Sequence, residues 1–188
     1  CGPFCACCPA RHAVGAGLTR TLGITIRAPG MPSTMKPDVL VRPIRESDLE
    51  SWRPLWVGYN SFYGRKGETA LPEEITQSTW RRFFEPAEPV FALVAEHEGK
   101  LVGLTHYLFH RSTTKIESVC YLQDLFTESA VRGQGIGRRL IEAVYERARL
   151  AGAKRVYWQT QATNEAGRAL YEKVASHAGF IVYSHDGQ

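Results

Sequence analysis

The sequence lacks any long apolar run. No stretch of its 188 residues approaches the roughly 18 apolar residues that a membrane-spanning helix needs, so we expect no such helix and no membrane partner. Apolar residues make up 44% of the chain and charged residues 22%, which is ordinary for a folded domain. A chain of this length can bury one good core but has no room for a second catalytic domain. The sequence therefore predicts a water-soluble protein with a single domain.

Cysteine is scarce, and four of the five cysteines lie within the first eight residues. A disulfide framework or a structural zinc site needs partners spread across the fold, so this distribution argues against both. Cys120 lies in an expected strand, where we interpret it as an inert buried thiol and not as a nucleophile. The pattern is typical of a reducing compartment, and we expect a cytoplasmic protein without a metal ion.

Acidic residues are absent from residues 1–34, which are rich in Gly, Ala, Pro and Arg. These residues show no sustained helical or strand period, so we expect a disordered extension. Because the chain begins with Cys, either the natural start is missing or the start was assigned too early, with Met31 and Met35 as alternatives. A targeting peptide is a further alternative, although glycines and Pro29 would interrupt its helix. We assign residues 39–188 to the folded domain.

Excess positive charge is confined to the same end of the chain. Residues 1–38 hold four basic side chains and one acidic side chain, which accounts for +3 of the formal net charge of +4. The rest of the chain is nearly neutral, so composition gives no sign of a phosphate-binding surface, and we expect no nucleic-acid partner.

Strand and helix patterns begin at Val39. We expect strands at residues 39–44, 90–96, 101–110, 118–127, 155–160 and 180–183. Helices are expected at residues 46–63, 72–84, 135–151 and 164–177. In the order βααβββαβαβ, antiparallel strands come first and strand-helix alternation follows. This order predicts an α/β fold with a mixed sheet and helices on its faces.

Residues 131–140 form the most informative segment, with the sequence VRGQGIGRRL between an expected strand and an expected helix. The start of a helix presents free N–H groups and partial positive charge, and glycines let the backbone approach an anion closely. Arg138 and Arg139 in the first turn oppose the helix dipole, which an anionic ligand would compensate. The segment therefore predicts a phosphate-binding loop, with a glycine-rich turn before a core helix as the structural alternative.

Glycine spacing separates three kinds of phosphate loop. The dinucleotide fingerprint needs G-x-G-x-x-G and an acidic residue about 20 positions later, whereas this loop reads G-x-G-x-G and residues 155–160 contain no acid. A P-loop needs a Lys followed by Ser or Thr, which are missing here. The remaining pattern, [QR]-x-x-G-x-[GA], is met by Arg132, Gly135 and Gly137. It resembles the acetyl-CoA loop of the GNAT superfamily of N-acetyltransferases.

The resemblance covers roughly residues 39–183 and includes two further motifs. Residues 156–160, VYWQT, together with Asn164, Leu170 and Tyr171, resemble the yeast branch that acetylates histones, polyamines and D-amino acids. Residues 121–127, YLQDLFT, are similar both to that branch and to the spermidine/spermine acetyltransferases. The resemblance implies the GNAT fold with the order βααβββαβαβ and acetyl-CoA as co-substrate.

The same resemblance implies a set of site residues. Backbone groups of Leu125, Phe126 and Thr127 would pair with the pantetheine arm as an added strand does. The loop that starts at Arg132 would bind the cofactor, Arg132 included, and the pyrophosphate would be held by the N–H groups of Gly133, Gln134, Gly135, Ile136, Gly137 and Arg138. Asn164 would contact the cofactor, and Tyr171 would lie near the thioester sulfur as the acid that protonates the leaving thiolate. A core aromatic is the structural alternative for Tyr171.

The chemistry also requires an exit for a proton. An alkylammonium with a pKa of about 10.4 loses its proton at neutral pH at a cost of roughly 4.6 kcal/mol. Gln123 stands where the spermidine/spermine enzymes have a glutamate proposed as the base, and it cannot accept that proton. In a regular strand Asp124 would point to the opposite face, so a water chain ending on Asp124, Glu117 or His110 is the alternative. His106 and His110 share one face of their strand, and we interpret them as structural.

The expected function is transfer of an acetyl group to a primary amine of a small molecule by direct attack in a ternary complex. The acceptor stays open between a polyamine, a lysine analogue and an amino acid. A protein or histone lysine acetyltransferase is the alternative, and a non-catalytic acetyl-CoA-binding module is less favoured because it has no use for a thiol acid. The resemblance and the short segment after Tyr183 favour a homodimer in which a neighbouring subunit completes the sheet edge.

Overall fold

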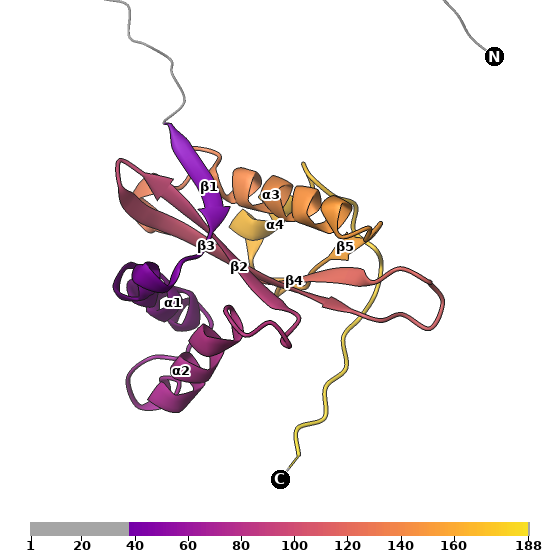
Figure 1. Ribbon diagram of the computed structural model, residues 1–188, viewed down its shortest axis with the longest axis horizontal. Coiled ribbons are helices and arrows are strands. Elements are labelled where there is room, and N and C mark those ends of the chain that lie inside the picture. The colour runs from indigo at the N-terminus through magenta and orange to yellow at the C-terminus, as the bar shows by residue number, and fades with distance from the viewer. Residues whose placement is uncertain (1–37, 188) are drawn as a thin grey trace, which may run out of the picture. The chain divides into compact units, whose positions relative to one another are not determined.

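The structure is a computed structural model that describes residues 38–187. The expected disordered extension at residues 1–34 and both alternative starts lie outside this range. In chain order (Figure 1), the helices and strands are β1 (Val39–Pro43), α1 (Leu49–Phe62), α2 (Glu73–Arg82), β2 (Val90–His97), β3 (Lys100–His110), β4 (Val119–Thr127), α3 (Ile136–Leu150), β5 (Val156–Tyr157) and α4 (Glu165–Tyr171). Short 3-10 turns precede α1, α2 and α3.

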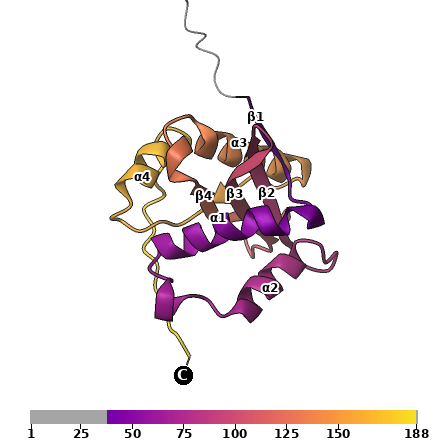
Figure 2. The ribbon, with the colours of Figure 1, turned by 90° about the vertical axis from the view of Figure 1, so that its left-hand side faces the viewer.

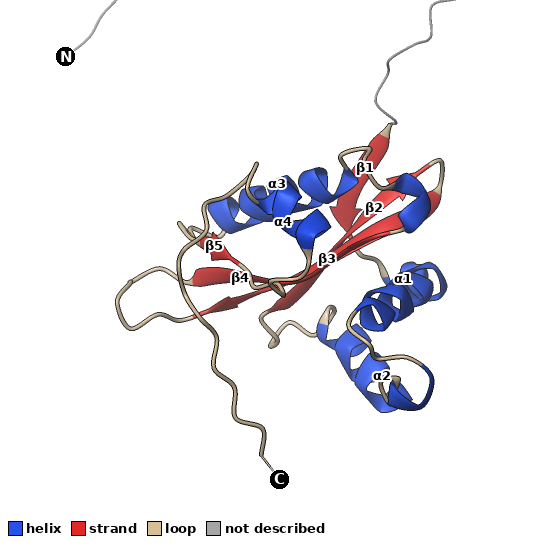
Figure 3. Cartoon of the chain, turned by 180° about the vertical axis from the view of Figure 1, so that it is seen from behind, coloured by secondary structure: helices blue, strands red, loops and turns tan. Residues whose placement is uncertain are grey.

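One five-stranded sheet organises the described residues, with the strand order β1-β2-β3-β4-β5. Strands β1 to β4 are antiparallel to their neighbours, and β5 is parallel to β4. Helices α1 and α2 lie on one face of the sheet (Figure 2), and α3 and α4 lie on the other (Figure 3). This is the mixed α/β sheet that the sequence predicts. The parallel pair of β4 and β5 needs a crossover connection, and α3 provides it.

Each face of the sheet has its own apolar core. The buried side chains of α3 keep helical spacing: Ile136, Leu140, Ile141, Val144 and Ala148. The buried aromatic and aliphatic side chains of α1 do the same: Trp52, Leu55, Trp56 and Tyr59. Burying each large apolar side chain contributes about 1.5–3 kcal/mol, so these two stripes hold both helices on the sheet. Within residues 38–187 no helix is long and apolar enough to cross a membrane.

Strands β4 and β5 separate soon after they pair. They are in register only at Cys120 opposite Val156 and Tyr121 opposite Tyr157, whereas β4 continues to Thr127. Its other edge stays paired with β3 as far as Thr127. Among the residues that the structure describes, the second half of β4 therefore has one edge without a neighbouring strand.

A β-bulge sets the side on which Asp124 lies. His106 is opposite Asp124, whereas Tyr107 is opposite Leu122, so Gln123 is an extra residue in β4. The extra residue reverses the alternation of side chains, and Asp124 lies against His106, which is packed among the aromatic side chains of α1. The expectation of a regular strand is wrong at this point.

The C-terminal part of the chain also differs from the expectation. No strand forms at residues 180–183, where Phe180, Ile181 and Tyr183 are 78%, 78% and 89% exposed. The strand expected at residues 155–160 is reduced to β5, and the last helix ends at Tyr171. The last strand is missing because a two-residue β5 offers little edge for another strand to pair with. The last helix ends early because β-branched Val174 and polar Ser176 are weak helix formers.

Candidate active site

One cleft of about 460 Å³ brings together most of the residues that the sequence predicts for the site. Its walls come from the ends of α1 and β4, the loop before α3, the first turn of α3, and α4. The predicted residues on its wall are Leu125, Phe126, Thr127, Arg132, Gly133, Gly135, Ile136, Gly137, Arg138, Asn164 and Tyr171. Gln134 and Asp124 are not on the wall.

The start of α3 presents an uncapped helix end to this cleft. Gly135 is the N-cap with φ of 84°, Gly133 has φ of 80°, and no side chain from residues 38–187 caps the helix. These left-handed conformations require glycine because other residues lose roughly 1–2 kcal/mol there. The first helical hydrogen bond runs from the Arg139 N–H to the Gly135 carbonyl at 3.1 Å. The three N–H groups of the first turn thus have no helical acceptor and can bind an anion.

The three arginines of the loop have different partners. The Arg139 guanidinium donates to the Val39 carbonyl at 3.0 Å, which ties α3 to β1. Arg132 Nε donates to the Thr127 carbonyl at 3.2 Å, and its guanidinium lies 5.9 Å from the centre of the Phe126 ring. Among the residues that the structure describes, none pairs with Arg138, which lines the cleft. Arg138 is therefore the loop cation with the most freedom to meet a phosphate.

Asn164 caps α4, a role that the sequence reading missed. Its side-chain oxygen accepts from the Gly167 N–H at 3.1 Å, and its amide nitrogen donates to Thr160 Oγ1 at 2.9 Å. An Asn N-cap satisfies a donor that the helix leaves unpaired. At Gly137, an added Cβ would lie 3.1 Å from Leu170 Cδ2, so the start of α3 packs closely on α4. The contact between Asn164 and the cofactor stays a prediction.

Tyr171 lies at the end of α4 with its ring edge-on to Trp158, and the ring centres are 5.4 Å apart. Burial raises the pKa of its hydroxyl to about 12, with a smaller contribution from Tyr63. No residue in the described range forms a hydrogen bond with this hydroxyl, although Tyr171 lines the cleft. The phenol is thus protonated and available to a ligand.

Asp124 belongs to a buried polar chain on the α1 face. Its Oδ2 lies 2.8 Å from His106 Nδ1, and His106 Nε2 accepts from Trp52 Nε1 at 3.1 Å. Because Nε2 is an acceptor, Nδ1 carries the imidazole hydrogen and donates it to the carboxylate. His106 is 1% exposed and Asp124 is 7% exposed. The imidazole therefore holds the carboxylate in place, a contact that the sequence does not predict.

Tyr59 is a cleft residue on which the charge of Asp124 acts, and sequence periodicity identifies it only as a core aromatic. It lines the cleft together with Tyr63. Burial raises the pKa of Tyr59, and the negative charge of Asp124 raises it further. Tyr59 in the last turn of α1 and Tyr63 directly after it keep helical spacing, which is a signal for one helix face but not for a cleft.

The other candidate bases are occupied elsewhere. His110 Nε2 lies 3.0 Å from the Tyr157 hydroxyl, and Glu117 pairs with Lys154 at 3.6 Å. Neither His110 nor Glu117 lines the cleft. Within residues 38–187 no group of three or more His, Cys, Asp and Glu could hold a metal ion. Burial raises the pKa of the Cys120 thiol to about 12, which agrees with an inert thiol.

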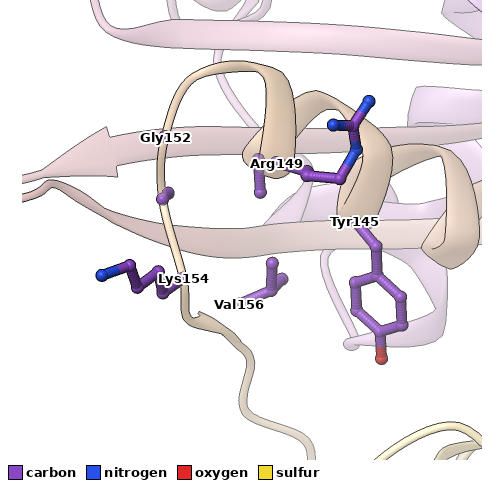
Figure 4. Close-up of a pocket in the computed structure, with 7 residues that line it drawn as sticks. Tyr145, Arg149, Gly152, Lys154 and Val156 are labelled. Carbon is purple, nitrogen blue, oxygen red and sulfur yellow. The ribbon is translucent and has the colours of Figure 1, made fainter.

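A second hollow of about 610 Å³ shares no wall residue with the cleft. It lies between the end of α3 and β5 (Figure 4), where Tyr145, Arg149, Gly152, Lys154 and Val156 surround it. Its two cations already have partners, since Arg149 pairs with Glu146 and Lys154 with Glu117. The hollow lies beside the outer edge of β5 and holds none of the predicted site residues.

Comparison with known proteins identifies the class to which this fold and cleft belong. Residues 49–175 match the model of the acetyltransferase (GNAT) family. The D-amino-acid N-acetyltransferase of Saccharomyces cerevisiae is 35% identical over 151 residues, covering 79% of this chain and 91% of the yeast protein. The uncharacterized N-acetyltransferase YhfO of Bacillus subtilis is 30% identical over 145 residues, covering 76% of this chain and 94% of the Bacillus protein. The chain belongs to the GNAT family and is an acetyl-CoA-dependent N-acetyltransferase.

Solved structures show the same fold. An aminoglycoside N-acetyltransferase, AAC(6')-Iy, in complex with CoA has a TM-score of 0.68 at 15% identity, covering 80% of this chain and 95% of that one. A transcriptional regulator from Bacillus halodurans has a TM-score of 0.68 at 22% identity, covering 79% and 99%. At these identities the likeness concerns the fold alone.

Proposed function

We propose that this chain transfers the acetyl group of acetyl-CoA to a primary amine of a small molecule by direct attack in a ternary complex. The observation that carries the proposal is the single cleft in which the uncapped start of α3, the open edge of β4, Tyr171 and Tyr59 meet. A phosphate-binding end and a proton-accepting end on one cleft suit a donor with a pyrophosphate and an acceptor with an ammonium group.

The donor lies along the α3 half of the cleft in this proposal. The free N–H groups of the first turn of α3 hold the pyrophosphate, with Arg138 beside them. The unpaired edge of β4 from Leu125 to Thr127 hydrogen-bonds to the amide groups of the pantetheine arm. The thioester then reaches the hydroxyl of Tyr171, which donates to the sulfur as the carbon–sulfur bond breaks.

The proton of the acceptor leaves through Tyr59 in this proposal. Asp124 does not line the cleft, whereas Tyr59 does, so the Tyr59 hydroxyl relays the proton and the carboxylate receives it. His106 keeps the carboxylate oriented through the 2.8 Å contact. The free amine attacks the carbonyl carbon, and the carbon–nitrogen bond forms as the carbon–sulfur bond breaks. The departing thiolate accepts a hydrogen bond from Tyr171, and the proton that the new amide nitrogen releases neutralises this thiolate.

Thiol release from acetyl-CoA tests the function with a panel of spermidine, lysine, thialysine, D-amino acids and a histone-tail peptide. We expect saturable turnover with one class of small amine. Turnover with the peptide alone would replace the proposal with a protein-lysine acetyltransferase. Tight acetyl-CoA binding without turnover on any amine would contradict it in favour of a binding module.

The variant Asp124→Asn tests the proton exit, because an amide oxygen can still accept the His106 N–H. We expect kcat/KM to fall about 100-fold at pH 7 and the deficit to shrink with rising pH, as the amine loses its proton without help. Glu117→Gln is the matched control and should leave the profile unchanged. An equal deficit at every pH, or the same defect in the control, would contradict the role of Asp124.

A further inference from the structure

Arg65 is a cation beside the acceptor end of the cleft that the proposed mechanism does not use. It follows α1 in the chain and is half-buried. Its guanidinium carbon lies 6.0 Å from the centre of the Tyr59 ring and 5.6 Å from that of Tyr63. Both tyrosines line the cleft. Arg65 itself is not on the wall, so its guanidinium lies behind two rings that are.

One edge of this guanidinium is fixed and the other is free. Arg65 Nε donates to Asn60 Oδ1 at 2.8 Å, and Asn60, which is 4% exposed, donates from Nδ2 to the Trp56 carbonyl at 2.8 Å. Across residues 38–187, no side chain or carbonyl accepts from the two terminal nitrogens of Arg65, and no carboxylate pairs with it. The backbone N–H and Nε of Arg65 both donate to Asn60, and these two bonds are enough to close the end of α1. The two terminal nitrogens, which together can donate to both oxygens of a carboxylate, are not used in this role.

The charges around Tyr59 are arranged for a zwitterion. Asp124 raises the pKa of Tyr59 and Arg65 lowers it, both less than burial does, so a negative and a positive charge act on one hydroxyl. An α-amino acid carries its ammonium and carboxylate groups on the same carbon. Its ammonium can approach the Tyr59–Asp124 side while its carboxylate meets Arg65. A polyamine would instead bring a further positive charge close to Arg65, which is unfavourable.

We infer that Arg65 is a specificity-determining residue that binds a carboxylate on the acceptor, so that the preferred acceptors are amino acids. The inference rests on the proposed function, because it places the acceptor amine beside Tyr59. The two terminal nitrogens of Arg65 would bind the carboxylate, and Asn60 would orient them through its hydrogen bond with Nε.

The test compares amino acids with their carboxamides, which keep the size and the amine but remove the negative charge. Alanine, leucine and phenylalanine, in both D and L forms, are paired with their amides in the thiol-release assay. The wild type should prefer the acids. In Arg65→Gln we expect kcat/KM for the acids to fall about 10- to 100-fold, mainly through KM, with the amides unchanged. Lys66→Gln, which removes the neighbouring exposed cation, should behave as the wild type.

Binding separates a failure of this inference from a failure of the proposed function. Calorimetry with CoA present measures the affinity of each free amino acid for the wild type and for Arg65→Gln without any turnover. Weaker binding of acids alone in the variant supports the inference even if transfer is absent. The inference would be overturned if Arg65→Gln lost equal affinity for acids and amides, or lost no affinity for either. It would also be overturned if the wild type bound other amines but no amino acid. Turnover of spermidine would in that case leave the proposed function intact.

Discussion

Replacing Tyr171 with Phe removes one oxygen from the cleft and little else. The ring still packs edge-on to Trp158, and the hydroxyl has no hydrogen-bond partner among residues 38–187. We therefore expect stability to change by less than about 0.5 kcal/mol and the affinity for acetyl-CoA to stay the same. Any effect on turnover then belongs to the chemical step.

The expected size of that effect follows from the pKa of the phenol. Burial raises it to about 12, whereas an ordinary thiol has a pKa of about 8.5. Complete proton transfer from Tyr171 to the thiolate is thus uphill by roughly 3.5 units, or about 4.8 kcal/mol. We expect Tyr171 to stabilise the sulfur mainly as a hydrogen-bond donor while negative charge develops. A hydrogen bond to a charged group contributes about 1.5–3 kcal/mol, which corresponds to a loss of about 10- to 150-fold in kcat.

Thiol release under saturating acetyl-CoA measures this loss, and calorimetry measures the binding of acetyl-CoA. Because the pKa of Tyr171 is raised, the phenol stays protonated up to about pH 12, and the rate should not fall between pH 8 and about 10 on its account. Tyr145→Phe is the matched control, since the Tyr145 hydroxyl donates to the Val174 carbonyl at 3.0 Å and is not on the cleft. An unchanged kcat in Tyr171→Phe, or an equal loss in acetyl-CoA affinity, would refute the reasoning.

Three further predictions concern the loop, the acid stability and the oligomeric state. Gly135→Ala forces a side chain into a φ of 84°, so we expect acetyl-CoA to bind about 10-fold more weakly in calorimetry with the KM for the amine unchanged. Arg42→Met leaves the carboxylate of Asp48, 8% exposed, without its partner at 2.7 Å, and should cost about 3 kcal/mol in urea unfolding at pH 7. Arg42 holds the pKa of Asp48 below its usual value, so this stabilisation is present above about pH 4 and is lost as the pH falls further, and the variant should show a flatter acid dependence. We propose a homodimer in which a second copy covers the outer edge of β5 and the exposed residues 180–183, so sedimentation should show dimers that become monomers when residues 180–188 are deleted, and a monomeric full chain at micromolar concentration would contradict this.

Local patterns account for the parts of the site that one segment builds. The start of α3 is predictable because glycine positions and the helical spacing of Ile136, Leu140 and Val144 depend only on neighbours in the chain. The cleft residues Tyr59 and Tyr63 are not, because their role depends on how the end of α1 meets the splayed edge of β4. Arg65 gives no sequence signal at all, since an arginine after a helix is usually explained by the helix dipole.

The C-terminal elements show where local pattern misleads. Residues 180–183 are apolar and β-branched enough to predict a strand, but a strand also needs a neighbour with free backbone groups. The two-residue β5 has few free backbone groups for a further strand, so residues 180–183 remain exposed. A propensity reading cannot supply the missing partner.

The bulge at Gln123 explains how a carboxylate comes to lie on the α1 face of the sheet. Cys120 and Leu122 are buried in the core beneath α3, and regular alternation would place Asp124 in that same apolar core. Burying an unpaired carboxylate there costs several kcal/mol, whereas the bulge leaves only an exposed Gln123 outside the ladder and gives the carboxylate the N–H of His106. A carboxylate at a core position of an otherwise regular strand pattern is thus itself a signal for a bulge. Here the bulge also places Asp124 on the α1 face of the sheet, where its charge raises the pKa of Tyr59.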